Sequence, residues 1–171
     1  KDKSGIVVKI LDCESGKFSE NVVDGCGSWD GVHLSSSVSF ILNNVRNCSC
    51  GIVVQEGFKG DVTHNHVTDN RCGLRLDTRA SAIVQMNRIE RNGLETEIGV
   101  DTTDPEVFLK GDAGCGILVE SSDLESLIPD HETKVISLSL SSNTIANNVC
   151  GLAIACSDAR GVQVRLSLLF L

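Results

Sequence analysis

Residues 60–93, GDVTHNHVTDNRCGLRLDTRASAIVQMNRIERNG, contain the same pattern of residue types twice. An apolar residue, an asparagine and a β-branched residue each return after 22 positions. The pairs are Val62 and Val84, Asn65 and Asn87, and Val67 and Ile89. A fixed interval of this length is the mark of a repeat architecture, and it has to be weighed before any single element is assigned.

The interval extends well beyond this stretch. The asparagine column consists of Asn21, Asn43, Asn65, Asn87 and, 56 residues further on, Asn143. The apolar residue three positions earlier is Phe18, Phe40, Val62, Val84 or Leu140, and the β-branched residue two positions later is Val23, Val45, Val67, Ile89 or Ile145. Each repeat then reaches a glycine followed by alternating apolar residues, as at Gly31, Gly51, Gly73, Gly116 and Gly151.

The pattern inside each repeat favours short strands. Runs of two to five residues alternate between apolar and polar side chains and are broken by Asn and Gly, and no stretch has the apolar spacing of a helix. Strands this short have no buried face as separate hairpins. If each repeat makes one turn of a coil, equivalent strands stack in parallel at about 4.8 Å. The sequence therefore predicts an all-β solenoid, a parallel β-helix of about six coils of ~22 residues.

Two columns have an expected structural role. Asn tolerates left-handed backbone at a turn, and its amide can bond to the equivalent Asn of the next coil, so we expect an asparagine ladder. A ligand-binding role for these amides is the alternative. We expect the glycines to mark sharp bends, where a Cβ atom would be costly.

Three segments carry a resemblance to a known family: residues 50–57 (CGIVVQEG), 60–70 and 73–93. They resemble the right-handed parallel β-helix repeats of the CASH class, and within it the β-helices of the F-box only protein 11 family. The resemblance covers residues 31–93 well and 112–160 less well, and it implies a right-handed coil. Such repeats occur in carbohydrate-active enzymes, copper-site maturation proteins and eukaryotic adaptors, so they specify fold better than function. The F-box and zinc-binding segment of that family are not in this sequence.

Two insertions interrupt the repeat, at about residues 94–114 and 121–134. Residues 93–135 hold eleven acidic residues and two lysines, a net charge of −9, whereas the whole chain has −8. The acidity is therefore local, and a basic protein partner is the expected ligand. The partner-binding candidates are Glu95, Glu97, Asp101, Asp104, Glu106, Asp123 and Glu125. A merely solvated loop and a weak Ca²⁺ site are the alternatives, although no EF-hand spacing is present.

The ends of the chain suggest a fragment of a longer protein, with residues 1–171 as a single β-helix domain. The first residue is not Met, and the tail, residues 161–171, is apolar. Arg165 falls where the repeat expects Asn. We expect this tail to cap the coil or to pair with other protein, for example by end-to-end association of copies.

The eight cysteines fall mainly into columns. Cys50, Cys72, Cys115 and Cys150 each precede the repeat glycine, and Cys26 and Cys48 share another position. We expect a column of buried thiols, because Cys packs as a small apolar residue. Disulfides between neighbouring coils and a metal site at Cys48-x-Cys50 are the alternatives. The absence of a signal-like apolar start favours reduced thiols and a cytoplasmic location.

The strand after each glycine is expected to turn its second and fourth following residues outward. These are His33 and Ser35, Val53 and Gln55, Arg75 and Asp77, and Leu118 and Glu120. Asp77 and Glu120 form the best pair of carboxylates for glycoside hydrolysis, with Arg75 beside them as a base for a lyase reaction. Sugar sites usually offer exposed aromatic rings, and only Trp29 is expected to be exposed. His64 and His66 are expected to be solvated, because no third zinc ligand is evident.

The preferred function is a non-enzymatic protein-interaction module, an adaptor or scaffold that uses the acidic loops or the outward strand face. A carbohydrate-binding or carbohydrate-cleaving β-helix is the alternative. No cofactor or metal is expected. The negative charge disfavours nucleic acid, and no apolar run is long enough for a membrane span.

Overall fold

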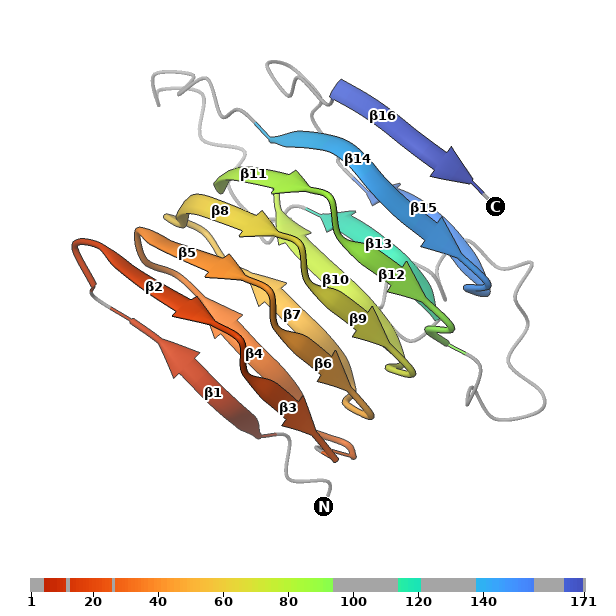
Figure 1. Ribbon diagram of the computed structural model, residues 1–171, viewed down its shortest axis with the longest axis horizontal. Helices are drawn as coiled ribbons and strands as arrows, with labels where there is room; N and C mark the ends of the chain where they lie inside the picture. The colour runs from red at the N-terminus through yellow and green to blue at the C-terminus, as the bar shows by residue number, and fades with distance from the viewer. Residues whose placement is uncertain are drawn as a thin grey trace.

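A computed structural model describes residues 5–11, 13–25, 27–93, 114–120, 138–155 and 165–170. These residues form β-strands joined by turns, and none of them is helical. Figure 1 shows the strands stacked side by side along one axis, from the N-terminal strand at one end to the C-terminal strands at the other. The stack follows the order of the repeats in the sequence.

One sheet, here called sheet 1, contains one strand from each coil. Its order is β1 (Ile6–Ile10), β4 (Asp30–Leu34), β7 (Cys50–Val54), β10 (Cys72–Asp77), β13 (Cys115–Glu120) and β15 (Cys150–Ala155), all parallel. Each neighbour in this order is the equivalent strand of the next repeat. Sheet 1 therefore confirms the parallel β-helix of six coils that the sequence predicts.

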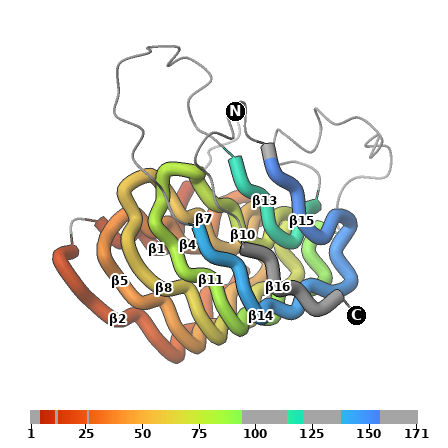
Figure 2. Tube along the Cα trace, turned by 90° about the horizontal axis from the view of Figure 1, so that it is seen from above, coloured from red at the N-terminus to blue at the C-terminus, as the bar shows by residue number. Residues whose placement is uncertain are grey.

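The second sheet, sheet 2, supplies the other walls of the coil. One row is β2 (Gly16–Ser19), β5 (Val38–Ile41), β8 (Lys59–Thr63) and β11 (Ser81–Gln85); the other is β3 (Val22–Asp24), β6 (Asn44–Arg46), β9 (His66–Thr68) and β12 (Arg88–Glu90). The long strand β14 (Ser139–Ala146) pairs with both β11 and β12, and β16 (Arg165–Phe170) pairs with β14. In Figure 2, which shows the molecule from above, β2, β5, β8, β11 and β14 follow one another from left to right.

The interior is built from the apolar columns. Phe40 lies opposite Val62 in the strand register, and Val62 lies opposite Val84, and all three side chains are fully buried in one core. The Phe18 and Phe40 rings stack with their centroids 5.4 Å apart. Side chains 22 residues apart therefore lie over one another, as the repeat predicts.

The asparagine column is hydrogen-bonded from coil to coil. In each step one Asn donates its backbone N–H and its Nδ2 to the Oδ1 of the next, at 2.9–3.1 Å, through Asn21, Asn43, Asn65, Asn87 and Asn143. A second column of the same kind runs through Asn70, Asn92 and Asn148. Cys48 precedes it and donates its backbone N–H to Asn70 Oδ1, at 3.0 Å.

The left-handed backbone is not at these asparagines, so that expectation was wrong. It belongs to the residue before each of them: Glu20, Leu42, His64, Met86 and Ser142 in the first column have φ between 54° and 62°. The preceding residue makes the corner, and the Asn that follows can then direct both its N–H and its side chain along the stack. The column therefore depends on two consecutive residues.

The repeat glycines lie inside strands and not at bends, which corrects the second expectation. A Cβ atom on Gly51 would come within 2.7 Å of the Gly73 carbonyl oxygen and 2.9 Å of Val67. A Cβ atom on Gly31, Gly73 or Gly116 would likewise lie 2.6–2.8 Å from a carbonyl oxygen of the next coil. These glycines are needed because neighbouring coils approach closely, and none of them has a positive φ.

The coil resumes its register after both interruptions. Leu74 lies opposite Ile117, and Arg88 opposite Thr144. The predicted insertions, about 94–114 and 121–134, fall outside the described residues apart from Gly114. The returning register shows that both are additions to a continuous coil.

The C-terminal strand continues the coil. β16 pairs in parallel with β14, with Arg165 opposite Ser139 and Leu168 opposite Asn143. The prediction that Arg165 takes the Asn position was therefore wrong: Leu168 takes it, so the last strand enters the sheet later along the chain than the repeat spacing indicates. End-to-end association of copies stays a prediction.

Candidate functional site

The outer surface of sheet 1 holds a hollow of about 310 Å³, here called the His33 hollow. Its lining residues come from β4, β7, β10 and β13 and the turns that follow β7 and β10: His33, Val53, Val54, Gln55, Glu56, Arg75, Asp77, Arg79 and Glu120. The predicted candidates Arg75, Asp77 and Glu120 are therefore brought together at one place.

The strand register explains how these candidates meet. Asp77 lies directly opposite Glu120 on the neighbouring strands β10 and β13. Arg75 stands two residues before Asp77, on the same side of β10, and its Nε donates to a carboxylate oxygen of Glu120. Burial lowers the pKa of Arg75, but the nearby negative charge of Glu120 outweighs it and the net shift is upward. The ion pair with Glu120 therefore favours the cationic form of Arg75, and its role as a base in a lyase reaction stays a prediction.

Asp77 has arginine neighbours of its own. Arg79 donates its backbone N–H to Asp77 Oδ1 at 2.8 Å and its Nη2 to Oδ2 at 3.3 Å. The Nη1 atom of Arg79 lies 2.9 Å from a carboxylate oxygen of Glu56. Both candidate carboxylates are thus hydrogen-bonded to guanidinium groups, and the hollow carries a network of paired charges.

His33 is the residue that the sequence analysis placed here without giving it a role. Its side chain is buried, with 8% of the residue exposed, and its Nε2 lies 2.9 Å from Asp30 Oδ2. The other oxygen of Asp30 accepts the backbone N–H of Cys50 at 3.1 Å. Because a carboxylate only accepts, the hydrogen of the imidazole is assigned to Nε2. Nδ1 is then a buried acceptor, and no described residue donates to it.

The outward face of sheet 1 is less open than predicted. Val53 and Leu118 point away from the main core, yet they are 7% and 0% exposed. With Cys50, Cys72 and Cys115 they form a second apolar cluster, and Cys150 and Ala153 pack against it. Outward position on a strand therefore does not mean exposure here. The predicted column of buried thiols is confirmed for Cys50, Cys72 and Cys115.

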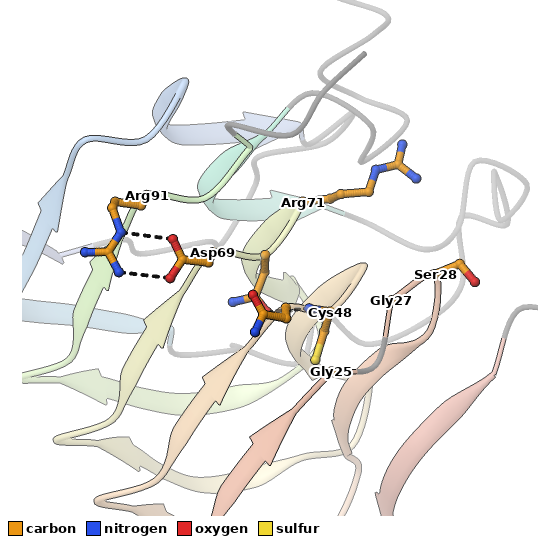
Figure 3. A pocket seen from close by; sticks show the side chains of 9 residues that line it. Gly25, Gly27, Ser28, Cys48, Asp69, Arg71 and Arg91 are labelled. Carbon is orange, nitrogen blue, oxygen red and sulfur yellow. Dashed lines mark hydrogen bonds and ion pairs between the residues drawn. The ribbon is translucent and has the colours of Figure 1, made fainter.

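A second hollow, of about 650 Å³, lies at the turns where the coil enters sheet 1. It is lined in part by Asn47, Cys48, Asp69, Arg71 and Arg91. Figure 3 shows Arg91 paired with Asp69 through two bonds, both 2.9 Å, while the Arg71 side chain points away from that pair. The hydrogen bond from Arg91 lowers the pKa of Asp69. The sequence analysis did not single out this hollow.

His66 is not simply solvated. Its Nε2 lies 3.0 Å from Glu90 Oε1, and Arg88 Nη2 lies 2.9 Å from Glu90 Oε2. Within the described part of the chain, no group of three or more His, Cys, Asp or Glu side chains is placed to hold a metal ion. The same residues contain no helix long and apolar enough to cross a membrane.

The acidic partner-binding candidates Glu95, Glu97, Asp101, Asp104, Glu106, Asp123 and Glu125 all lie outside the described residues. Two of these candidates are close in sequence to a residue of the His33 hollow. The segment that contains Asp123 and Glu125 follows directly after Glu120, which lines the His33 hollow.

Comparison with known proteins gives one family. The family described as "Right handed beta helix region" matches residues 3–168, nearly the whole chain. No curated protein and no solved structure matches the chain. The match agrees with the stacked parallel strands.

Proposed function

We propose that this chain, which belongs to the right-handed β-helix family, is a non-enzymatic protein-interaction module. In this proposal the His33 hollow receives a hydrogen-bond donor from a partner protein, and a lysine side chain is the best fit. The observation that carries the proposal is the buried Nδ1 of His33, an acceptor to which no described residue donates. A buried acceptor left unpaired costs about 1–3 kcal/mol, and a donor brought by a partner recovers part of that.

The charge of the hollow supports a cationic donor. Three carboxylates, those of Glu56, Asp77 and Glu120, face two guanidinium groups, those of Arg75 and Arg79. These five side chains together carry one net negative charge. An ammonium group can donate to His33 and to a carboxylate at once, because it carries three hydrogens.

The predicted acidic insertions also favour a positively charged partner. Residues 121–134 carry Asp123, Glu125, Asp130 and Glu132 against Lys134 and continue from Glu120. A basic partner drawn by these charges would reach the hollow with a faster association rate at low salt. The surface would then combine long-range attraction with one buried contact.

The arrangement of the carboxylates argues against catalysis as the first choice. A glycosidase keeps one carboxyl protonated as an acid and leaves the other open to the sugar or water. Here Glu120 and Asp77 both receive hydrogen bonds from arginines. None of the side chains that line the hollow belongs to Phe, Trp or Tyr, the residues on which sugars usually stack.

The test is a binding titration with peptides of defined charge. Fluorescent peptides rich in lysine, in glutamate or in neutral serine are titrated with the whole chain, at low and at moderate salt. We expect only the lysine-rich peptide to bind, more weakly at high salt. The Glu120→Gln and His33→Ala variants should each weaken it several-fold.

A control variant at the other hollow tests whether binding depends on the His33 hollow. Asp69→Asn removes one surface carboxylate at the other hollow, and it should leave the affinity nearly unchanged. Equal binding of all three peptides, or equal loss in Asp69→Asn and Glu120→Gln, would overturn the proposal, since general charge attraction would then explain the binding.

A carbohydrate-binding or carbohydrate-cleaving function is the second candidate, because Asp77 lies opposite Glu120 in one hollow. Incubation with acidic and neutral polysaccharides, followed by a reducing-end assay and a melting scan, tests it. Turnover that disappears in Asp77→Ala would make this function the better one. A melting temperature that no polysaccharide shifts would exclude it.

A further inference from the structure

The cysteine column on sheet 1 runs across four neighbouring strands, β7, β10, β13 and β15. Cys50 lies opposite Cys72 in the register of β7 and β10, and Cys115 lies opposite Cys150 in that of β13 and β15. The strands β10 and β13 are neighbours as well, with Leu74 opposite Ile117, so Cys72 and Cys115 lie level with each other in the same column. Cys50, Cys72 and Cys115 belong to the second apolar cluster, and Cys150 packs against it.

The pairs differ in how open they are. Cys50, Cys72 and Cys115 are 5%, 3% and 2% exposed, whereas Cys150 is only half-buried. The hydrogen bond with Cys72, together with burial, raises the pKa of Cys50 well above its usual value. Burial, and then the neighbouring thiol of Cys150, raises the pKa of Cys115. A thiol reacts with oxidants as its thiolate, so a half-buried thiol is the reactive member of the column.

We propose that Cys150 and Cys115 form a redox pair that a peroxide closes into a disulfide between the fifth and sixth coils. In the first step the Cys150 thiolate attacks one oxygen of hydrogen peroxide, the O–O bond breaks, and sulfenic acid and hydroxide form. In the second step the Cys115 sulfur attacks the sulfenic sulfur. The S–O bond breaks, the proton of the Cys115 thiol leaves with the oxygen as water, and the disulfide forms.

The backbone already suits this bond. Strands that neighbour each other in a sheet lie about 4.8 Å apart, inside the Cα separation that disulfides show. Cys115 and Cys150 are direct partners in the register of β13 and β15. The bond therefore forms without a change of register, and water is the only group that has to leave.

The Cys115–Cys150 disulfide would cross-link two coils on either side of an interruption of the repeat. Residues 116–149 lie between the two cysteines and include the predicted insertion at 121–134. Closing this loop restricts the unfolded chain and should raise the melting temperature by on the order of 5 °C. Oxidation thus stabilises the end of the coil nearest Glu120 and the acidic segment.

The experiment treats the reduced, full chain with a small excess of hydrogen peroxide at neutral pH. Remaining thiols are alkylated, the protein is digested, and the peptides are identified by mass spectrometry. We expect a cross-linked peptide containing Cys115 and Cys150. Cys50 and Cys72, with the same register but both buried, should be recovered alkylated and not cross-linked. Oxidation of the exposed Cys13 shows that the peroxide reached the protein.

Variants separate the two steps. Cys150→Ser should abolish the cross-link, and Cys72→Ser should leave it unchanged. Cys115→Ser should stop the reaction at the sulfenic acid of Cys150, which dimedone traps. If Cys115→Ser does not fold, peptide mapping of the unaltered chain still shows whether Cys115 and Cys150 form the cross-link.

Three outcomes would overturn the inference. One is recovery of both Cys115 and Cys150 as alkylated thiols after Cys13 has been oxidised. Another is a cross-link from Cys150 to Cys156, and the third is a cross-link from Cys115 to Cys72, because each shows that another sulfur is the natural partner.

Discussion

Asn65 donates both its backbone N–H and its side-chain Nδ2 to a single atom, the Oδ1 of Asn87, at 2.9 and 3.0 Å. Both residues are almost fully buried, with 1% and 2% exposed. One side-chain oxygen thus satisfies two donors from the neighbouring coil, and the same amide donates onward to Val62 and Asn143. The polar groups of a corner that is closed to water are paired in this way.

Asn87→Ala should therefore be strongly destabilising. The substitution leaves the Asn65 N–H without its acceptor and removes the donor to the Val62 carbonyl. We expect a loss of about 3 kcal/mol in the free energy of unfolding, from the cost of unpaired buried groups. Urea unfolding followed by circular dichroism measures it. Asn21→Ala, at the half-buried end of the column, should cost about 1 kcal/mol. Equal losses at both sites would contradict this account.

Gly51→Ala should destabilise the coil because the nearest atom to the new Cβ is a backbone oxygen of the next coil, with the Val67 side chain at 2.9 Å beside it. The Cβ would lie 2.7 Å from the Gly73 carbonyl oxygen, so the two coils must move apart. We expect a loss of about 1–3 kcal/mol, in the range for overpacked sites. Gly16→Ala is the matched control, since its nearest neighbour would be Val38 at 3.7 Å. A melting temperature lowered equally in both variants would show that close approach is not the cause.

Met86 occupies a left-handed corner with φ of 54° and is 53% exposed. Asn tolerates this conformation better than Met does, and little apolar burial is lost. Met86→Asn should therefore raise the free energy of unfolding by up to about 1 kcal/mol, and the β-branched Met86→Val should lower it by about 1 kcal/mol. Thermal melts of the two variants test this prediction. Changes of the same sign in their melting temperatures would be inconsistent with strain at this corner.

Glu90 should make stability depend on pH. Burial raises its pKa, but hydrogen bonds from Arg88 and His66 outweigh this and lower the net pKa below the ordinary 4.5. Above that value the carboxylate is ionised in both folded and unfolded chains, and its contribution is complete. As the pH falls through the folded pKa, the contribution is lost.

Glu90→Gln should accordingly cost about 1–3 kcal/mol at pH 7 and much less at pH 3, as measured by urea unfolding at both values. Arg91 Nη1 also lies 3.6 Å from Glu90 and adds to the effect. Glu56→Gln removes an exposed partner of Arg79 and should cost about 0.5 kcal/mol or less. A difference for Glu90→Gln that grows toward acid pH would show that the sign is wrong.

The repeat was enough to predict the coil because stacking is a nearest-neighbour property. When each residue lies over its equivalent in the next coil, the same side-chain type is favoured at every turn, and the column is visible in the sequence. Phe40, Val62 and Val84 were placed correctly for this reason. The left-handed corners were misplaced by one residue because several residue types occupy them and leave no such column.

The candidate site was predicted only in part. Asp77 and Glu120 could be assigned to one outward face, but their direct opposition required the register across the interruption after residue 93. No role for His33 could be predicted from the sequence. That role depends on the contact of its ring with Asp30 on the same strand and on the unpaired Nδ1. The burial of Val53 and Leu118 also contradicts the alternation rule, which fixes direction and not exposure.

By itself the sequence determined the period, the parallel stacking, the buried columns and the position of the thiols, because each of these repeats locally from coil to coil. Only the tertiary structure decided which charges are paired, which outward residues are covered and which imidazole nitrogen lacks a donor. Those features depend on contacts between side chains of different type on neighbouring coils, and such contacts occur once and leave no period in the sequence.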